Sequence, residues 1–473
     1  MIESIVPKVQ HFRNRLFHLF KYRADATMDL IDALAGPNRE SVVKLSLSQL
    51  FRRTYCSITD VIDNTFRRKA EQNPDVQELQ KAHLKISQLL AEQCPTPNIR
   101  GFSLFATDCT AKPRVYSSTV TDRTIVHAPN HVPGQKPITV GHEYSLVVFL
   151  PEDRADREAH WTCPISIRRV QSHETGPQVG LEQIQALITK TVFQWELCVV
   201  VADAAYSTRN WVVNVASIPN LIQIARLRSN RILHQQPACI DDIMPRGRPA
   251  SYGKKFHLSN PPEPDETDQF EKVRFSGKRW TVRVSRWHDL LMRGEGAQHM
   301  HRFPFDVVRV QVFDENGRLV FKNPLWLIVT GQRRRELGLC AIYESYDQRY
   351  DIEHCFRFGK QKLLLARSQT PDTRHEENLM WITMLSFSML HQVRKLAAVT
   401  RFHWEKRKIA ALTKTATATQ VQRDYERIIR GIGTPARIPK PRGKSPGRQN
   451  GALVPHRNVS PIIRKARPMA VRC

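Results

Sequence analysis

Closely paired cysteines are missing from this chain. Its nine cysteines are scattered along the sequence and form no Cys-x-x-Cys pair. Disulfide frameworks and structural zinc sites both depend on closer spacing. We therefore predict reduced, mostly buried thiols in a cytoplasmic protein. The 18 histidines show no persuasive metal-ligand spacing either, and His299 and His301 fall in a stretch that reads as a loop.

Long apolar runs are also missing. No apolar stretch reaches about 18 residues, the length that a membrane-spanning helix requires. The first 20 residues interleave apolar and charged side chains and lead to no small-residue cleavage site. We therefore expect neither a transmembrane segment nor a secretory signal, and we find no internal repeat.

Acidic residues are scarce relative to basic ones. The chain has 72 Lys and Arg against 45 Asp and Glu, which gives a net charge of +27. Such a charge attracts polyanions, with nucleic acid as the first candidate. An anionic membrane surface is the alternative, for which only residues 1–25 resemble an amphipathic helix. The 473 residues, 41% hydrophobic, suffice for one large core or two to three smaller ones.

Helical periodicity marks the first part of the chain. Apolar residues recur at helical spacing over 75–93, and the region carries basic clusters such as Arg52–Arg53. Pro95 and Pro97 then break the pattern. We predict a helical N-terminal DNA-binding region over residues 1–97.

The next region alternates short apolar runs with one helical pattern. We expect strands at 101–108, near 114–120, and at 144–150, 197–203 and 221–228, with a helix at 181–194. The run 197–203 is apolar throughout, as in a central strand covered on both faces. Residues 98–230 therefore indicate an α/β fold.

The second half of the chain shows strand-like, then helical, then Pro- and Gly-rich sequence patterns. Alternating runs at 273–287, 305–313 and 319–329 predict an antiparallel β insertion over residues 231–340. Helices at about 345–366 and 376–398 follow within 341–400, and residues 401–433 form a C-terminal helical region. Residues 434–473 carry ten basic and no acidic side chains among many Pro and Gly, which predicts a disordered basic tail.

Two aspartates follow apolar runs. Asp108 closes the run 101–108, and Asp203 closes the run 197–203. The carboxyl ends of strands in an open α/β sheet are where ligands bind. Two carboxylates there repel each other unless a cation lies between them, and oxygen ligands suit Mg²⁺ or Mn²⁺. The alternative is that both residues are ordinary turn or helix-cap aspartates.

A polar row characterises the helix expected at about 345–366. At 100° per residue, its side chains project within a stripe about 60° wide. The row consists of Tyr346, Arg349, Glu353 and Lys360. A carboxylate among cations suits a site that holds metal and binds phosphate. The alternative is a solvated face with i,i+4 charge pairs.

The row has the spacing Y-x₂-R-x₃-E-x₆-K. It resembles the YREK signature of one group of DDE transposases from bacterial insertion sequences, and the resemblance covers about residues 100–400. It implies a ribonuclease-H-like catalytic core with a β insertion between the second Asp and the Glu. It also implies that two Mg²⁺ (or Mn²⁺) ions are held by three catalytic carboxylates, Asp108, Asp203 and Glu353.

The same resemblance assigns the other residues of the row to DNA. Tyr346, Arg349 and Lys360 are expected to contact phosphates of the transposon-end strand. In some relatives a tryptophan of the β insertion stacks on a displaced base. Trp280, Trp287 and Trp326 are the candidates here, with burial in the core as the alternative.

The implied function is metal-dependent cleavage at insertion-sequence ends and strand transfer into target DNA. Its partner is double-stranded DNA, bound by a homodimer in the synaptic complex, in the bacterial cytoplasm at the nucleoid and not at a membrane. Two alternatives stay open at this point. One is a ribonuclease-H-like nuclease that cuts without joining, and the other is an inactive transposase-derived protein that only binds DNA.

Overall fold

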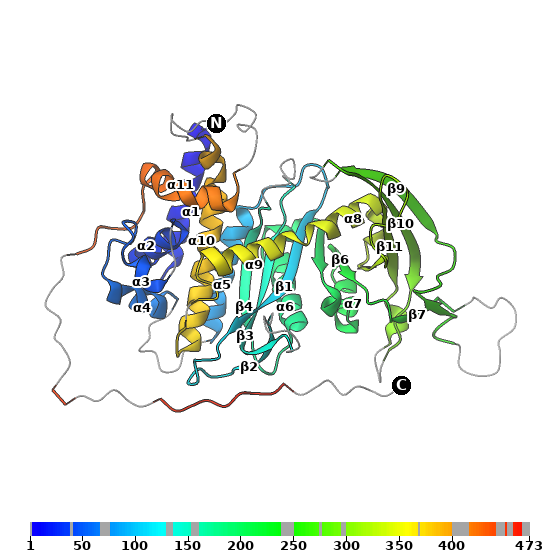
Figure 1. The fold of residues 1–473 in the computed structure, drawn as a ribbon, viewed down its shortest axis with the longest axis horizontal. Helices are drawn as coiled ribbons and strands as arrows, with labels where there is room; N and C mark the ends of the chain where they lie inside the picture. The colour runs from blue at the N-terminus through cyan, green and yellow to red at the C-terminus, as the bar shows by residue number, and fades with distance from the viewer. Residues whose placement is uncertain are drawn as a thin grey trace.

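We describe the chain from a computed structural model. The described residues are 2–37, 41–66, 76–128, 136–152, 160–237, 250–273, 277–294, 299–367, 369–399, 416–440, 450–451 and 457–465. Figure 1 shows a helical part at one end and a long sheet that extends to the other. Within the described residues, no helix is long and apolar enough to cross a membrane.

Five strands form the centre of the sheet. They are β1 (Ser103–Pro113), β3 (Ile138–Phe149), β4 (Cys163–Val170), β5 (Cys198–Ala202) and β6 (Leu221–Arg226). Their order is β4-β3-β1-β5-β6, with antiparallel pairing among β4, β3 and β1 and parallel pairing from β1 to β5 to β6. This mixed α/β arrangement is consistent with a ribonuclease-H-like DDE fold.

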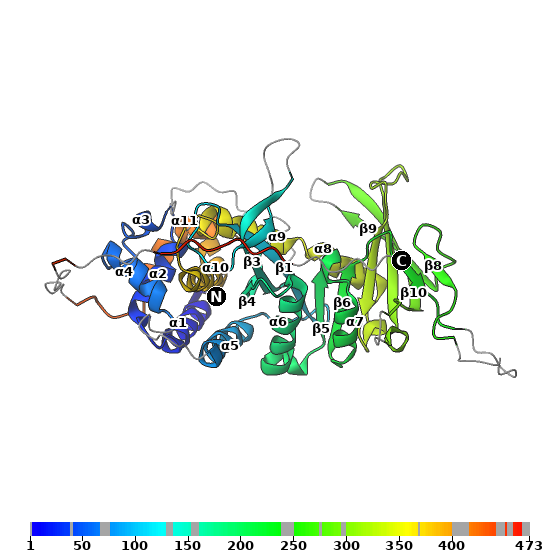
Figure 2. The ribbon, with the colours of Figure 1, turned by 90° about the horizontal axis from the view of Figure 1, so that it is seen from below.

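Helices cover both faces of this centre. α6 (Gly176–Lys190) and α7 (Arg209–Ala216) lie on one face, and α8 (Leu339–Gln348) and α9 (Asp351–Lys362) lie on the other (Figure 2). Every residue of β5 is buried, as its apolar sequence predicts for a strand covered on both sides. α6 begins with a capping box made by Thr175 and Gln178.

The sheet continues beyond β6 through antiparallel strands. β12 (Leu325–Thr330) pairs with β6 and is followed by β11 (Phe305–Phe313), β10 (Arg279–Leu290) and β9 (Glu266–Val273). The strands β9 to β12, within the range 231–340 for which we predicted an antiparallel β insertion, thus lengthen the same sheet. The remaining strands are β2 (Thr124–His127) at the opposite edge and the separate pair β7 (Ile232–His234) and β8 (Lys255–His257). Short 3-10 helices occupy Val192–Trp195, Ala204–Tyr206, Met300–Arg302 and Arg334–Glu336.

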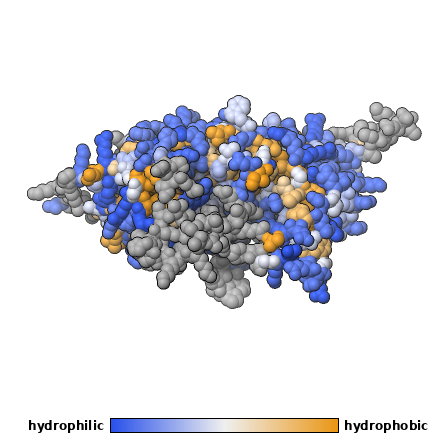
Figure 3. Space-filling view, turned by 90° about the horizontal axis from the view of Figure 1, so that it is seen from above, coloured by the Kyte–Doolittle hydropathy of each residue, from blue (hydrophilic) through white to orange (hydrophobic). Residues whose placement is uncertain are grey.

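The N-terminal helices pack around the helices of the C-terminal part. The set consists of α1 (Ile2–Leu19), α2 (Ala24–Ala35), α3 (Val42–Leu45), α4 (Tyr55–Asn64), α5 (Val76–Glu92), α10 (Thr373–Val399) and α11 (Ala418–Ile432). α10 contacts α1, α2, α4 and α11, and both α10 and α5 contact β4. The apolar core therefore runs without interruption from these helices into the sheet. The coloured part of the face seen in Figure 3 is largely hydrophilic, with hydrophobic residues in small groups.

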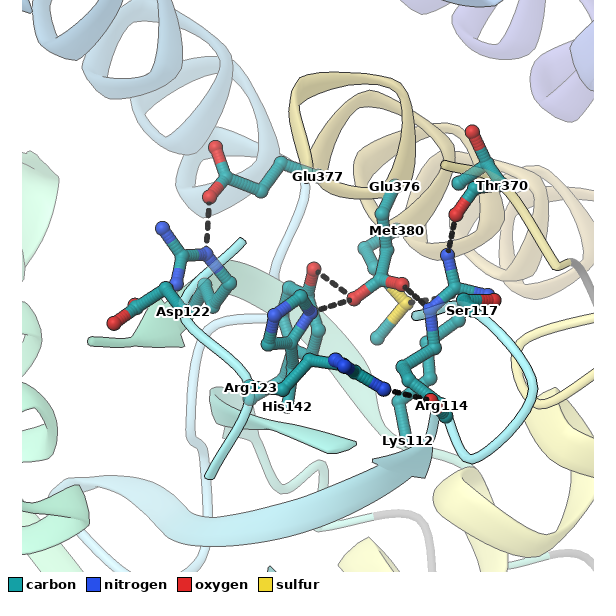
Figure 4. A network of polar contacts seen from close by, with 12 residues as sticks. Lys112, Arg114, Ser117, Asp122, Arg123, His142, Thr370, Glu376, Glu377 and Met380 are labelled. Carbon is teal, nitrogen blue, oxygen red and sulfur yellow. Dashed lines mark hydrogen bonds and ion pairs between the residues drawn. The ribbon is translucent and has the colours of Figure 1, made fainter. Parts of the chain in front are cut away.

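A buried ionic network ties β1 and β3 to α10 (Figure 4). The Glu376 carboxylate on α10 forms an ion pair with Arg114 Nε at 2.6 Å, accepts from Tyr144 OH at 2.8 Å, and contacts His142 Nδ1 at 2.7 Å. Lys112 is fully buried beside them. Arg114 begins the turn that follows β1, and the chain forms no strand over 114–120. Our prediction of a strand there is wrong, because Arg114 pairs with Glu376 on α10 and the chain turns directly after it.

The predicted disorder of residues 434–473 does not hold for two described segments. Ala436 is buried, and the Arg437 N–H donates to Asp25 Oδ1 at 2.9 Å. Near the end of the chain, the Ile463 N–H donates to the Arg123 carbonyl at 2.8 Å, beside β2. Backbone hydrogen bonds to distant parts of the fold order these segments, although their own composition is poor in core-forming residues.

The prediction of mostly buried cysteines does not hold for the described residues, where three of seven are buried. All seven cysteines among the described residues are free thiols. Cys163, Cys198 and Cys355 are buried, whereas Cys56 is exposed. Cys239 and Cys473 lie outside the described residues.

Candidate active site

The first carboxylate lies inside a strand, not at its end as we predicted. β1 pairs with β5 only as far as Ala106 opposite Val201, but it stays paired with β3 up to Pro113. Asp108 therefore lies just beyond the parallel pairing, where β5 has ended and the sheet opens. The Cys109 N–H donates to Asp108 Oδ1 at 2.8 Å and orients the carboxylate.

The second carboxylate follows β5 directly. Asp203 comes one residue after the end of this strand, and its Oδ1 accepts from the Ala205 N–H at 2.8 Å. It thus caps the 3-10 helix Ala204–Tyr206, so the cap interpretation of the sequence also holds. Its position at the carboxyl edge of the parallel strands is the one predicted.

The third carboxylate belongs to a helix that is divided. The single helix predicted at about 345–366 is wrong: α8 ends at Gln348, and α9 begins at Asp351. The Glu353 N–H bonds to the Tyr350 carbonyl, three residues back, so the chain tightens locally to 3-10 geometry. Both linking residues keep right-handed helical angles. The charges of Asp108 and Asp203 act on the row at both of its ends, so the row still faces these carboxylates.

One guanidinium joins two of the carboxylates. Arg349 Nη1 lies 3.3 Å from Asp108 Oδ2, and Arg349 Nη2 lies 3.0 Å from Glu353 Oε1. The Arg349 guanidinium carbon also lies 6.0 Å from the centre of the Tyr346 ring. Residues 241 positions apart in the sequence are therefore brought together at one edge of the sheet.

The charges of Asp203 and Glu353 both act on the Asp108 carboxyl group. The pKa of Asp108 is raised to about 6, chiefly by burial and in smaller part by the charges of Asp203 and Glu353, while the Cys109 N–H and Arg349 act against this. Burial lowers the pKa of Lys360, while the charge of Asp108 raises it. The site thus concentrates negative charge that is only partly neutralised by its own cations.

Comparison with known proteins identifies the family. The model of the family described as DDE superfamily endonuclease matches residues 15–294. The chain belongs to the DDE superfamily of endonucleases. The matched residues include Asp108 and Asp203 and end before Glu353. No curated protein matches the chain at a significant level.

Endonucleases of the DDE superfamily act on DNA and generally use divalent metals. Three carboxylates are a suitable donor set for Mg²⁺ or Mn²⁺, which prefer oxygen ligands. Within the described residues, no three His, Cys, Asp or Glu side chains are grouped closely enough to hold a metal ion. Arg349 instead lies between Asp108 and Glu353 and binds both. The residues therefore fit a divalent cation by their chemistry, while a guanidinium joins two of the candidate ligands.

The structure distinguishes among the three tryptophans of this DDE endonuclease. Trp287 and Trp326 are buried, with their rings 5.5 Å apart, and Trp287 Nε1 donates to the Pro262 carbonyl. Both belong to the core, as the alternative interpretation held. Trp280 is half-buried on the same strand, β10, and lies against Phe321.

The sequence analysis missed one cation of the site. Arg226 ends β6 at the same carboxyl edge, and its charge lowers the pKa of Tyr346, which burial raises. The available signal was a charged residue inside the predicted strand 221–228, two positions before its end.

Proposed function

We propose that this DDE endonuclease is a transposase of the YREK group, which cuts DNA at insertion-sequence ends and transfers the cut strand into target DNA. The observation that carries the proposal is the convergence of Asp108, Asp203 and Glu353 around Arg349. A nuclease needs the carboxylates, whereas the flanking cations suit a site that also holds the end strand in place for joining.

In this proposal the three carboxylates hold two divalent cations, Mg²⁺ or Mn²⁺. When bound, the cations supply neutralisation of the charge that develops on the scissile phosphate. Arg349 releases Asp108 and Glu353 and turns its guanidinium toward phosphate oxygens, which it is suited to bind in bidentate fashion. Lys360, partly buried beside Asp108, donates to a neighbouring phosphate.

End recognition is assigned to the N-terminal helical region, with double-stranded DNA as the partner and a homodimer as the synaptic unit. The cluster Arg52–Arg53 is less free for DNA than its sequence suggested. Arg52 Nη2 lies 2.7 Å from Asp29 Oδ1, and Arg53 Nε lies 3.2 Å from Asp29 Oδ2. Arg67, Arg68 and Lys69, the other basic cluster of this region, lie outside the described residues.

Strand transfer tests the proposal. A labelled duplex with a pre-cut element end is mixed with plasmid target and Mg²⁺, with the wild type, with Glu353→Gln and with Glu344→Gln. Glu344 is the matched control, because it is an exposed glutamate on the adjoining helix α8. We expect joined products from the wild type and the control and none from Glu353→Gln, which still binds the duplex.

The alternatives give other results. Cleavage of an intact end without any joining by the wild type would show a nuclease of the ribonuclease-H-like class. Binding of the duplex with neither cleavage nor joining would show an inactive DNA-binding protein. Equal joining by Glu353→Gln and the wild type would remove Glu353 from the active site.

A further inference from the structure

A basic cavity lies along α9, the helix that carries Glu353. It has a volume of about 200 Å³ and opens between α9, the first turn of α11 and the residues just before β4. Its lining among the described residues contains four basic side chains and no carboxylate. These four, called the basic pocket below, are His160, His354, Arg357 and Lys362.

The basic groups of this pocket are held close together. The rings of His160 and His354 stack at 4.0 Å with an angle of 5° between their planes. His160 Nδ1 is held by Asp351 Oδ1 at 2.7 Å, so that buried carboxylate is already engaged. The pocket therefore gathers four basic side chains, which an anion would stabilise.

The two strong cations of the pocket lack a counter-charge in the described structure. Arg357 and Lys362 are exposed, and neither forms an ion pair with a described residue. By contrast, Arg430 on α11 is paired with Glu426 one turn away. Unpaired cations that share one cavity are suited to bind phosphate, which carries several acceptor oxygens.

Aromatic side chains form the floor of the pocket. Trp161 lies 5.6 Å from Phe387, and Phe358 also lies 5.6 Å from Phe387, measured between ring centres. The Trp161 Nε1–H donates to the Ala416 carbonyl at 2.8 Å and fixes the ring. Apolar walls reduce the local dielectric screening, which strengthens the attraction between the cations and an anion.

We propose that the basic pocket binds a backbone phosphate of the DNA substrate, at a position outside the row from Tyr346 to Lys360. The proposal rests on the proposed function, because it requires DNA along α9. Arg357 follows Glu353 by four residues, about 6 Å along the helix axis. A strand that places one phosphate at the carboxylates thus continues past the pocket.

Three double variants test this assignment. Arg357→Gln with Lys362→Gln removes the strong cations of the pocket. Lys254→Gln with Lys255→Gln is the matched control, because it removes two exposed cations at the start of β8, which lies away from α9 (Figure 2). Arg357→Lys with Lys362→Arg preserves the charge. All four positions are exposed, and equal urea midpoints verify that the variants fold.

Binding is measured by fluorescence anisotropy of a labelled end duplex in EDTA, between about 50 and 200 mM salt. We expect the pocket variant to bind about tenfold more weakly, because hydrogen bonds to charged groups are lost. The slope of log affinity against log salt should fall by about one. The control and the charge-preserving variant should match the wild type.

A second series replaces single phosphates of the duplex by neutral methylphosphonates. We expect one position to weaken binding by the wild type and to have no effect on the pocket variant. Equal affinity of the pocket variant and the wild type would overturn the assignment. If inorganic phosphate raises the unfolding midpoint of the wild type alone while no methylphosphonate has an effect, the pocket takes free phosphate and not DNA. Absence of DNA binding by the wild type would instead overturn the proposed function itself.

Discussion

Glu376 is the residue whose replacement should most destabilise the link between the sheet and α10. Its carboxylate is fully buried, and it contacts Arg114, His142 and Tyr144 at 2.6–2.8 Å (Figure 4). Glu376→Gln keeps the shape of the side chain but removes the charge. The buried cations Lys112 and Arg114 then lose the negative charge of Glu376 that faces them. We expect the free energy of unfolding to fall as a result.

The magnitude follows from the pKa of this carboxyl. Burial raises it, but Lys112, the hydrogen bond to His142 and the charge of Arg114 outweigh burial and lower the pKa from 4.5 to about 2. At about 1.4 kcal/mol for each pH unit, this lowering corresponds to about 3 kcal/mol of stability at neutral pH. Breaking a buried ion pair typically costs about 3–5 kcal/mol, which agrees.

Urea unfolding at several pH values measures this effect. The folded-state pKa lies below the unfolded-state value, so the stabilisation is complete above pH 4.5 and is lost as the pH falls toward 2. The difference between the wild type and Glu376→Gln should therefore be about 3 kcal/mol at pH 7 and shrink steadily below about pH 5.

Glu377→Gln is the matched control for this experiment. Glu377 is the next residue, its side chain is 29% exposed, and it pairs with Arg169 at 2.6 Å. A partly exposed pair of this kind contributes about 1 kcal/mol or less. A loss below about 1 kcal/mol at pH 7 for Glu376→Gln, or a loss that does not change with pH, would refute the reasoning.

Three further outcomes are expected. Lys112→Met removes a buried amine whose pKa burial lowers from 10.5 to about 8. In urea titrations, the unfolding free energy of the wild type should therefore rise by about 3 kcal/mol relative to that of the variant between pH 8 and pH 10.5. Trp211→Ala, at a fully buried ring, should cost about 3–5 kcal/mol in the same assay. Arg349→Ala frees the carboxylates of Asp108 and Glu353. The affinity for Mn²⁺, measured by electron paramagnetic resonance, should then rise about tenfold while strand transfer falls. An unchanged Mn²⁺ affinity would contradict competition between Arg349 and the metal for these carboxylates.

Local sequence patterns were enough to predict the centre of the fold. The apolar run 197–203 gave β5 within a residue at each end, and the pattern at 376–398 gave most of α10. Both elements are determined by which faces they bury, and burial is visible in the order of apolar residues. The row from Tyr346 to Lys360 could also be predicted from the sequence, because helical spacing places its members on one side.

The parts that were predicted wrongly depend on long-range contacts. α8 ends at Gln348, whose buried side chain donates to the Pro151 carbonyl and accepts from Arg100. β1 runs beyond Asp108 because β3 continues to pair with it. The basic pocket joins His160 to α9 across almost 200 residues of sequence. No local pattern encodes these contacts, since each partner is specified in a distant segment.

The most direct test of the central claim is to map where a divalent cation binds. Fe²⁺ takes the place of Mg²⁺, and ascorbate with peroxide then cuts the chain beside the bound metal. We predict fragments that end near Asp108, Asp203 and Glu353 in the wild type and in Glu344→Gln, and loss of these fragments in Glu353→Gln. Cuts at other positions, or the same three cuts in Glu353→Gln, would contradict a metal site built from these carboxylates.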